Sequence, residues 1–305
     1  MSIKLVQTLL ICFIIASCVP NENNSKIDKS KHDGLLRFDT NSAYQIYYSE
    51  GHLEEVKKQA IYIEEAYEFL SELLYKKTDF AVLVISEKDW EINAYSPVPG
   101  MPEYYKGNLI VGAGQNAMAD GYAQMLHNFP SEVTEHLFNI YTDASGNLDM
   151  KLFFDKLAIH ELTHSFQDPQ NAEGYSVSRW LEEVHANMGL YAFYKSKRPN
   201  ELKYIMTLAN FGAQNPPAEL PFSSLEEFDA NYFKMTPDVY GFYQMRFTTL
   251  AKNVIDSLGN ESLKRINDFI LKYDESYKDQ FTPEILKSKL AEEVGEAFVD
   301  LINKW

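Results

Sequence analysis

Two histidines and two glutamates stand at the spacing that binds a catalytic metal ion. His160 and His164 belong to an H-E-L-T-H motif. Residues four apart lie on one face of a helix, so both imidazoles can reach one metal at about 2.0–2.1 Å. Glu161 follows the first histidine and can face a metal-bound water. Glu183, eighteen residues after His164, would complete a His, His, Glu set. Such a set leaves the fourth position open for water, as catalytic zinc requires.

The residues around the first motif favour a metal over a solvated helix face. H-E-x-x-H alone occurs in many helices without metal, where two histidines simply meet solvent. Here the neighbouring residues are apolar: Phe153, Phe154, Leu157, Ala158, Ile159 and Leu162. A buried helix needs partners for its polar side chains, because each unpaired buried polar group costs roughly 1–3 kcal/mol. A metal supplies such a partner, and we predict one Zn²⁺ per chain.

The two motifs together resemble the gluzincin metallopeptidases. The resemblance rests on H-E-x-x-H with a glutamate after eighteen residues, and on W-L-E-E-V-H-A at 180–186, which is similar to W-L-N-E-G-F-A in the aminopeptidase N type. It implies His160, His164 and Glu183 as zinc ligands and Glu161 as the general base. The G-x-M-E-N motif that holds a free N-terminus in aminopeptidases is absent. Terminal and internal cleavage therefore both stay open.

The resemblance also implies supporting residues. Gluzincins often place a tyrosine beyond the zinc site, where its hydroxyl meets the oxyanion of the reaction. Tyr243, followed by an apolar helix and Leu-Gly-Asn-Glu, matches that pattern, and Tyr240 competes for the role. The alternative is that both belong to the aromatic core. Asn187 stands one turn after Glu183, where thermolysin-like relatives carry an acid. It could accept the Nδ1 proton of a ligand histidine, or make a plain interhelical hydrogen bond.

The elements that position these residues are mainly helical. Apolar residues at steps of three and four predict long helices over 52–76 and 239–258. Trp90–Lys106 carries three prolines and predicts a loop. Short apolar runs predict strands at Ala43–Tyr48, Phe80–Ile85 and Asn108–Gly112. We therefore expect an α+β fold: a mostly helical zincin-like metallopeptidase domain with a small N-terminal mixed β-sheet and a helical C-terminal half.

One strand has a further expected role. In gluzincins the edge strand of the small sheet borders the cleft and pairs with the substrate backbone, as strand addition would predict. By the resemblance, Asn108–Gly114 is the candidate for this edge. An internal sheet strand is the alternative.

The N-terminus has the pattern of a targeting segment, which lies outside the fold. Lys4 precedes an apolar run, Leu5–Ile15, that is too short for a ~20-residue membrane span. Ile15–Cys18 matches a bacterial lipobox. We expect a signal peptide over 1–17 and a lipid on Cys18. An ordinary secretory signal cut near Ser17 is the alternative.

The organisation that follows is a flexible tether over 18–37 and one metallopeptidase domain over 38–305. The tether is polar and lacks apolar periodicity. Val19 follows Cys18 where the usual inner-membrane retention signal has Asp. We expect a protein anchored in the bacterial cell envelope, at the outer membrane, on its periplasmic or surface face.

Composition narrows the function classes. The chain has 305 residues, 45% of them apolar, which can bury a substantial core. A net charge of −16 argues against nucleic acid, which needs a basic footprint. We expect a monomer that meets the membrane only through its lipid and takes a peptide or protein substrate.

Two other classes stay open: a catalytically silent zinc- or peptide-binding surface lipoprotein of the same fold, and a structural lipoprotein with a coincidental motif. The glutamate beside both histidines favours the peptidase.

Overall fold

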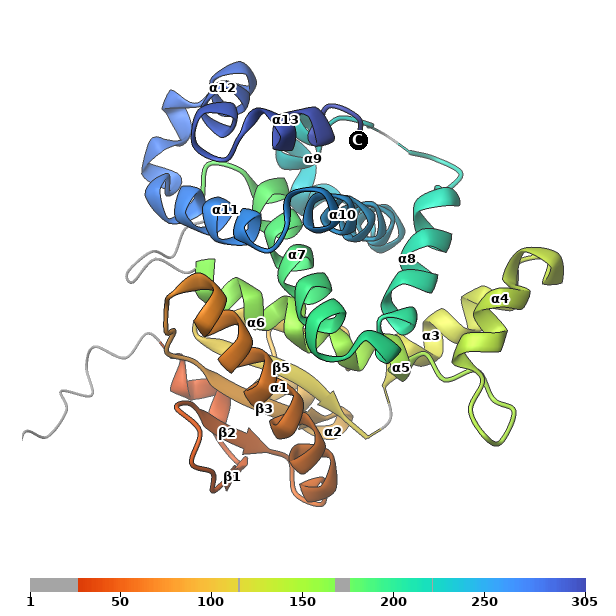
Figure 1. Cartoon of the computed structure of the whole chain (residues 1–305). Coiled ribbons are helices and arrows are strands. Elements are labelled where there is room, and N and C mark those ends of the chain that lie inside the picture. Colours follow the sequence, from red (N-terminus) through yellow and green to blue (C-terminus); the bar gives the residue numbers. More distant parts are fainter. Residues whose placement is uncertain (1–26, 115, 168–175, 221) are drawn as a thin grey trace, which may run out of the picture.

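The computed structural model describes residues 27–114, 116–167, 176–220 and 222–305. The fold is α+β and mostly helical, with one small mixed sheet near the N-terminus and helices through the rest of the described chain (Figure 1). The predicted fold class is therefore confirmed. The predicted signal peptide and Cys18 lie outside the described residues. Among the helices that are described, none combines the length and apolar character that a bilayer crossing needs.

The sheet has the strand order β1-β2-β3-β5-β4. Its strands are β1 (Leu36–Phe38), β2 (Gln45–Tyr48), β3 (Ala81–Ser86), β4 (Glu103–Tyr105) and β5 (Asn108–Ala113). The three central strands run parallel, and β1 and β4 pair antiparallel at the two edges. The central strands β3 and β5 are buried on both faces, which explains why they appear in the sequence as continuous apolar runs.

The stretch predicted as a loop over 90–106 holds the end of a helix and a strand. Helix α2 (Glu87–Asn93) follows β3, and β4 turns back along β5. The hairpin between β4 and β5 uses Lys106 and Gly107, both with positive φ (46° and 74°), as a two-residue turn of this hand requires. The predicted role of Asn108–Gly114 as the edge is wrong, because β4 covers that side. The edge strand is β4.

The predicted tether is also too long, because folded structure begins before residue 37. A short 3₁₀ helix, η2 (Lys29–His32), lies against the sheet. The side-chain amide of Asn93 donates to the carbonyls of Lys31 and Asp33 at 2.8 and 2.9 Å. Ile27 and Leu35 pack on the outer face of the sheet. Side-chain-to-backbone hydrogen bonds hold this segment, so it needs little apolar periodicity.

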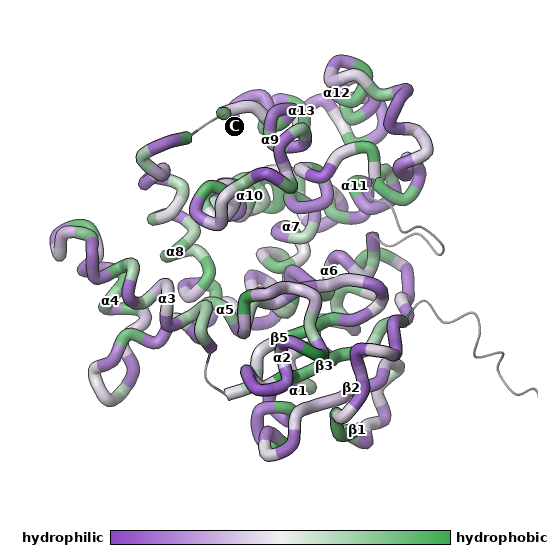
Figure 2. The backbone as a smooth tube through the Cα atoms, turned by 180° about the vertical axis from the view of Figure 1, so that it is seen from behind, coloured by the Kyte–Doolittle hydropathy of each residue, from purple (hydrophilic) through white to green (hydrophobic). Residues whose placement is uncertain are grey.

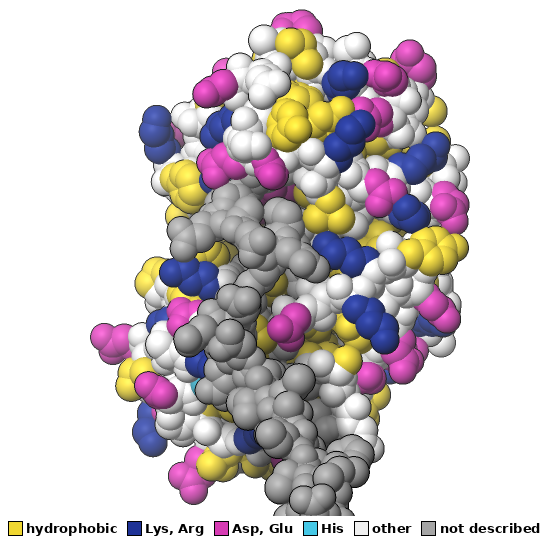
Figure 3. Space-filling model, turned by 90° about the vertical axis from the view of Figure 1, so that its left-hand side faces the viewer, with side chains coloured by type: hydrophobic (Ala, Val, Ile, Leu, Met, Phe, Trp, Pro, Cys, Tyr) yellow, Lys and Arg dark blue, Asp and Glu magenta, His cyan; other side chains and the backbone are white. Residues whose placement is uncertain are grey.

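A long helix and a second, all-helical layer complete the fold. Helix α1 (Leu53–Leu74) buries an apolar stripe against the sheet and α6. The remaining α-helices are α3 (Ala117–Leu126), α4 (Ser131–Tyr141), α5 (Lys151–Phe154), α6 (Ala158–Gln167), α7 (Arg179–Lys197), α8 (Lys203–Gln214), α9 (Leu225–Asn231), α10 (Pro237–Leu258), α11 (Glu261–Lys272), α12 (Pro283–Glu293) and α13 (Glu296–Ile302). Hydrophobic positions gather along the central strands, and hydrophilic ones recur on the outer helices (Figure 2). On the face in Figure 3, acidic and basic side chains are interspersed.

Helix α7 lies at the centre of the helical layer. Every residue from Trp180 to Tyr194 is buried, and α7 packs against both α6 and α10. Its buried side chains include Glu182, Glu183, His185 and Asn187. Each needs a polar partner inside the fold, so the centre of this layer is where a polar site must form.

Helices α6 and α7 approach each other closely at Gly189. A Cβ built on Gly189 would lie 2.2 Å from Thr163 Oγ1 and 2.6 Å from Thr163 Cγ2. The Thr163 hydroxyl donates to the Ile159 carbonyl at 2.8 Å, which holds its rotamer. The contact fixes how α7 presents its carboxylate to the two histidines of α6.

We expect Gly189→Ala to lower the free energy of unfolding by about 1–3 kcal/mol, because an added methyl overpacks this contact. Denaturant unfolding of the metal-free protein measures the change. Gly121→Ala is the control, since its Cβ meets nothing within 4 Å; in helix α3 it should be neutral or stabilise by up to ~1 kcal/mol. If both substitutions changed the free energy of unfolding by the same amount, α6 and α7 could move apart to accept the methyl group, and the close contact at Gly189 would not limit their packing.

Candidate metal centre

The structure brings His160, His164 and Glu183 together. The two histidine Nε2 atoms lie 3.1 Å apart. Glu183 Oε2 lies 3.3 Å from the Nε2 of His160 and 3.7 Å from that of His164. Two ligands about 2.0–2.1 Å from a tetrahedral metal stand roughly 3.3–3.4 Å apart. The three donor atoms therefore form a triangle of the size that one zinc ion fits.

Gln167 sets the tautomer of His164. Its side-chain oxygen lies 2.7 Å from His164 Nδ1, and its side-chain nitrogen donates to the Glu182 carbonyl at 2.8 Å. The second bond fixes the orientation of the amide, so Nδ1 of His164 carries the proton. The same nitrogen lies 2.8 Å from Nδ1 of the buried His185. Nε2 of His164 is thus the atom that can bind a metal.

The electrostatics at His164 favour a cation. Burial alone lowers the pKa of His164, but the hydrogen bond and charge of Glu183 outweigh burial and raise that pKa to about 9. Burial disfavours the charged form of Glu183 as well, yet its hydrogen bonds to the two histidines hold its pKa well below the usual value. Without a metal, the two shifts favour a protonated His164 imidazole beside an ionised Glu183 carboxylate. A metal ion would replace that proton.

Glu183 is oriented from the opposite side by three residues. The Tyr232 hydroxyl donates to Oε1 at 2.9 Å, and the Tyr240 hydroxyl donates to the same oxygen at 3.4 Å. The side-chain amide of Gln244 donates to Oε2 at 2.8 Å. Sequence reasoning missed Tyr232, from the 3₁₀ helix η5 (Tyr232–Lys234), and Gln244. The only signal for Gln244 is its place one turn after Tyr240 on α10.

Glu161 lies beside the metal position without being part of the triangle. Its Oε1 stands 4.0 Å from His160 Nε2. Burial raises the pKa of Glu161, and the backbone amide of Tyr104 in the edge strand β4 donates to its carboxylate. The side chains of Glu161 and His164 are 15% and 19% exposed, so water reaches both. Glu161 has the place and the raised pKa of a general base, next to the sheet edge.

Only one of the two candidate tyrosines reaches the site. Tyr240 contacts Glu183 as described, and burial raises its pKa well above the usual value. Tyr243 is fully buried and donates to the Phe222 carbonyl. Its ring stacks on Phe222 and Trp305. The predicted catalytic role of Tyr243 is therefore wrong: α10 turns Tyr240 and Gln244 towards α7 and Tyr243 towards the core.

Asn187 does not contact a ligand histidine, so its predicted partner is wrong. Its side-chain nitrogen donates to the Glu183 carbonyl at 2.9 Å and to Gln244 Oε1 at 3.1 Å. Its side-chain oxygen accepts from the Thr248 hydroxyl at 2.7 Å. Asn187 faces α10, while the histidines approach from α6 on the other side of α7. Gln167, and not Asn187, accepts the Nδ1 proton of His164.

We expect Gln167→Met to weaken zinc binding by about 10–100-fold, because it removes the acceptor that fixes His164. Competition with a chelating dye measures the affinity. Gln124→Met, on the exposed surface of α3, makes the same chemical change away from the site and should leave the affinity unchanged. Identical affinities in both variants would remove Gln167 from this description of the site.

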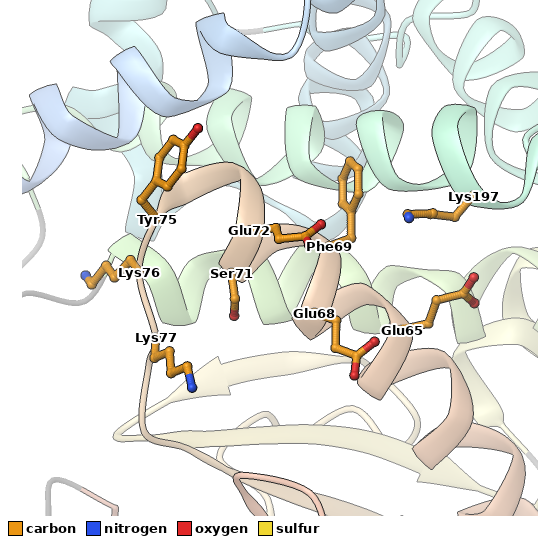
Figure 4. A pocket seen from close by; sticks show the side chains of 9 residues that line it. All are labelled: Glu65, Glu68, Phe69, Ser71, Glu72, Tyr75, Lys76, Lys77 and Lys197. Atoms are coloured by element: carbon orange, nitrogen blue, oxygen red, sulfur yellow. The ribbon is translucent and has the colours of Figure 1, made fainter.

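A separate pocket of about 700 Å³ lies along the outer face of α1 (Figure 4). Its lining mixes three acids, three lysines, two rings and one hydroxyl: Glu65, Glu68, Phe69, Ser71, Glu72, Tyr75, Lys76, Lys77 and Lys197. His160, His164 and Glu183 take no part in it. The donor triangle, and not this pocket, therefore holds the groups that can activate a metal and a water.

No protein-family model and no curated protein matches this chain. Among solved structures, it is similar to an aminopeptidase N family protein from Idiomarina loihiensis, with a TM-score of 0.51 and 11% sequence identity. The match covers 88% of this chain and 46% of that one, so this chain spans about half the length of its structural neighbour. At this identity the likeness shows the fold alone. The chain thus combines a fold similar to that of this neighbour with a His, His, Glu group that can hold a metal.

Proposed function

We propose that this protein is a zinc-dependent peptidase that hydrolyses peptide bonds. One observation carries the proposal: the donor triangle of His160, His164 and Glu183 has a carboxylate, Glu161, beside it that is not one of the ligands. Zinc is the metal that this set of two imidazoles and one carboxylate suits, with an open position for water. A binding protein without turnover would have no use for Glu161.

Each residue of the site has a task in this reaction. A zinc ion held by the three ligands would supply a Lewis acid that polarises the scissile carbonyl and makes water more acidic. Glu161 takes a proton from the attacking water on its carboxylate and passes it to the leaving amine nitrogen. Tyr240 keeps its proton and donates a hydrogen bond from its hydroxyl to the carbonyl oxygen as negative charge develops there.

The edge strand β4 is our proposed place for the substrate backbone. It forms one edge of the sheet, and its Tyr104 amide contacts Glu161. A peptide that adds to this edge by backbone hydrogen bonds would lie beside the general base. Backbone pairing fits many sequences, so this edge supports a peptide or protein substrate.

The proposal is tested by incubating the purified protein with peptide mixtures and identifying the products by mass spectrometry. Zinc-dependent cleavage, lost with a chelator and restored by zinc, is the expected result. A protein that binds zinc stoichiometrically and cleaves nothing across a broad library would support the alternative, a silent zinc-binding protein of the same fold.

We further propose that the protein is anchored in the bacterial cell envelope, at the outer membrane, through a lipid on Cys18. The support is the lipobox pattern in the sequence. Cys18→Ala should move the protein from the detergent phase to the aqueous phase in a detergent partition experiment. A wild-type protein that partitions into the aqueous phase would contradict the anchor.

A further inference from the structure

The side chain of Gln244 touches two parts of the site at once. Its nitrogen lies 2.8 Å from Glu183 Oε2 and 2.8 Å from the Tyr240 hydroxyl oxygen. An amide nitrogen carries two hydrogens, so both bonds form together. Glu183 Oε2 is also the oxygen that faces both histidines. Gln244 thus joins the carboxylate oxygen that faces the two histidines to the hydroxyl of Tyr240.

Neighbouring side chains permit only one orientation of this amide. Gln244 Oε1 accepts from the Asn187 side-chain nitrogen at 3.1 Å. Asn187 is itself fixed, since that nitrogen also donates to the Glu183 carbonyl and its oxygen accepts from Thr248. A flipped Gln244 would set its oxygen against the Glu183 carboxylate and its nitrogen against the Asn187 nitrogen. The chain Thr248, Asn187, Gln244 and Glu183 therefore has one consistent set of donors and acceptors.

The same geometry directs the proton of Tyr240. The oxygen of Tyr240 accepts a hydrogen bond from Gln244, so the Tyr240 proton must point away from that amide. This proton has a long contact of 3.4 Å with Glu183 Oε1, an oxygen that already accepts from Tyr232 at 2.9 Å, and the hydroxyls of Tyr232 and Tyr240 also interact with each other. A long bond to a shared acceptor is weak. This proton is the one most easily redirected to a substrate oxygen.

We propose that Gln244 is a positioning residue that holds the Glu183 carboxylate for the metal and turns the Tyr240 hydroxyl towards the substrate. This inference rests on the proposed zinc peptidase function. The inference gives the C-terminal half of the chain a role in the site. Through the amide of Gln244, helix α10 orients both the Glu183 carboxylate and the Tyr240 hydroxyl. The contacts of Gln244 with Glu183 and with Tyr240 cannot be inferred from the H-E-x-x-H motif and the spacing of Glu183.

The test compares Gln244→Met with Asn253→Met in the full chain. Methionine keeps the length of glutamine and removes both donors; Asn253 is an exposed amide on the same helix. Zinc affinity, measured with Zn²⁺ alone against a chelating dye, should fall by about 10–100-fold for Gln244→Met and stay unchanged for Asn253→Met. Circular dichroism checks that each variant folds. Gln244→Asn, too short to reach both partners, replaces Gln244→Met should the latter fail to fold.

A second measurement separates positioning from packing. Gln244→Met should lower kcat with little change in KM, and should lower kcat no further in a Tyr240→Phe background. In that background zinc affinity should still fall by the same factor. If Gln244→Met lowered kcat by the same factor in the wild type and in Tyr240→Phe, Gln244 would not act through Tyr240. Equal zinc affinities of wild type and Gln244→Met would overturn this inference alone, whereas a wild type that binds no zinc would overturn the proposed function with it.

Discussion

Glu161→Gln is expected to bind zinc as tightly as the wild type and to lower peptide hydrolysis by about 10²–10⁴-fold, the range of a lost general base. The amide keeps the shape of the carboxylate and can still accept from the Tyr104 amide. It cannot take a proton from water at neutral pH. Metal content by mass spectrometry and kcat on one cleaved peptide measure the two effects.

The geometry explains why metal and activity should separate in this variant. The three ligand atoms lie 3.1–3.7 Å apart, and Glu161 Oε1 lies outside that triangle at 4.0 Å from His160 Nε2. The exposed Glu72, changed to Gln, is the matched control and should alter neither quantity. Loss of zinc from Glu161→Gln would make Glu161 a ligand, and retained turnover would remove it as the base.

Glu183→Ala is expected to lose both zinc and activity. The substitution removes one of three donors, so the affinity should fall by more than the about 10–100-fold seen when only a supporting residue is lost. It also leaves the hydrogen-bond donors of Tyr232 and Gln244 facing an empty space. Zinc that stays at full stoichiometry in this variant would contradict the assignment of Glu183.

The same variant gives a pH-dependent result in the metal-free protein. Burial lowers the pKa of His164, but the hydrogen bond and charge of Glu183, with smaller contributions from Glu161 and Gln167, raise it from 6.5 to about 9. A group whose pKa rises on folding stabilises the fold fully below pH 6.5, and this stability is lost as the pH rises through about 9. The free energy of unfolding of metal-free wild type should therefore fall across this range. Glu183→Ala should show a flatter profile, and parallel profiles would contradict the coupling.

The grouping of the three candidate metal ligands could be predicted from the sequence because their geometry is mostly local. His160 and His164 share one helix face by spacing alone, and Glu183 follows from a motif on the next helix. The strands β3 and β5 could be predicted for a similar reason, since strands buried on both faces are continuously apolar. In each case a short stretch of sequence contains the pattern from which the helix face or the strand can be predicted.

The residues that support the ligands could not be predicted in the same way. Tyr232 and Gln244 meet Glu183 across 49 and 61 residues of chain, and nothing local marks them. The choice between Tyr240 and Tyr243 depends on which face of α10 meets α7, which tertiary packing decides. The edge strand β4 has only three residues after a proline-rich stretch, too few for a pattern.

Metal content of the purified wild-type protein tests the central claim most directly. Activity assays need the right substrate, but a stoichiometric metal needs only the site. After supply with zinc and removal of the excess, mass spectrometry should find about one zinc per folded chain, as the closed donor triangle of His160, His164 and Glu183 implies. A folded protein that carries little or no zinc under these conditions would contradict the metal site, and the peptidase proposal with it.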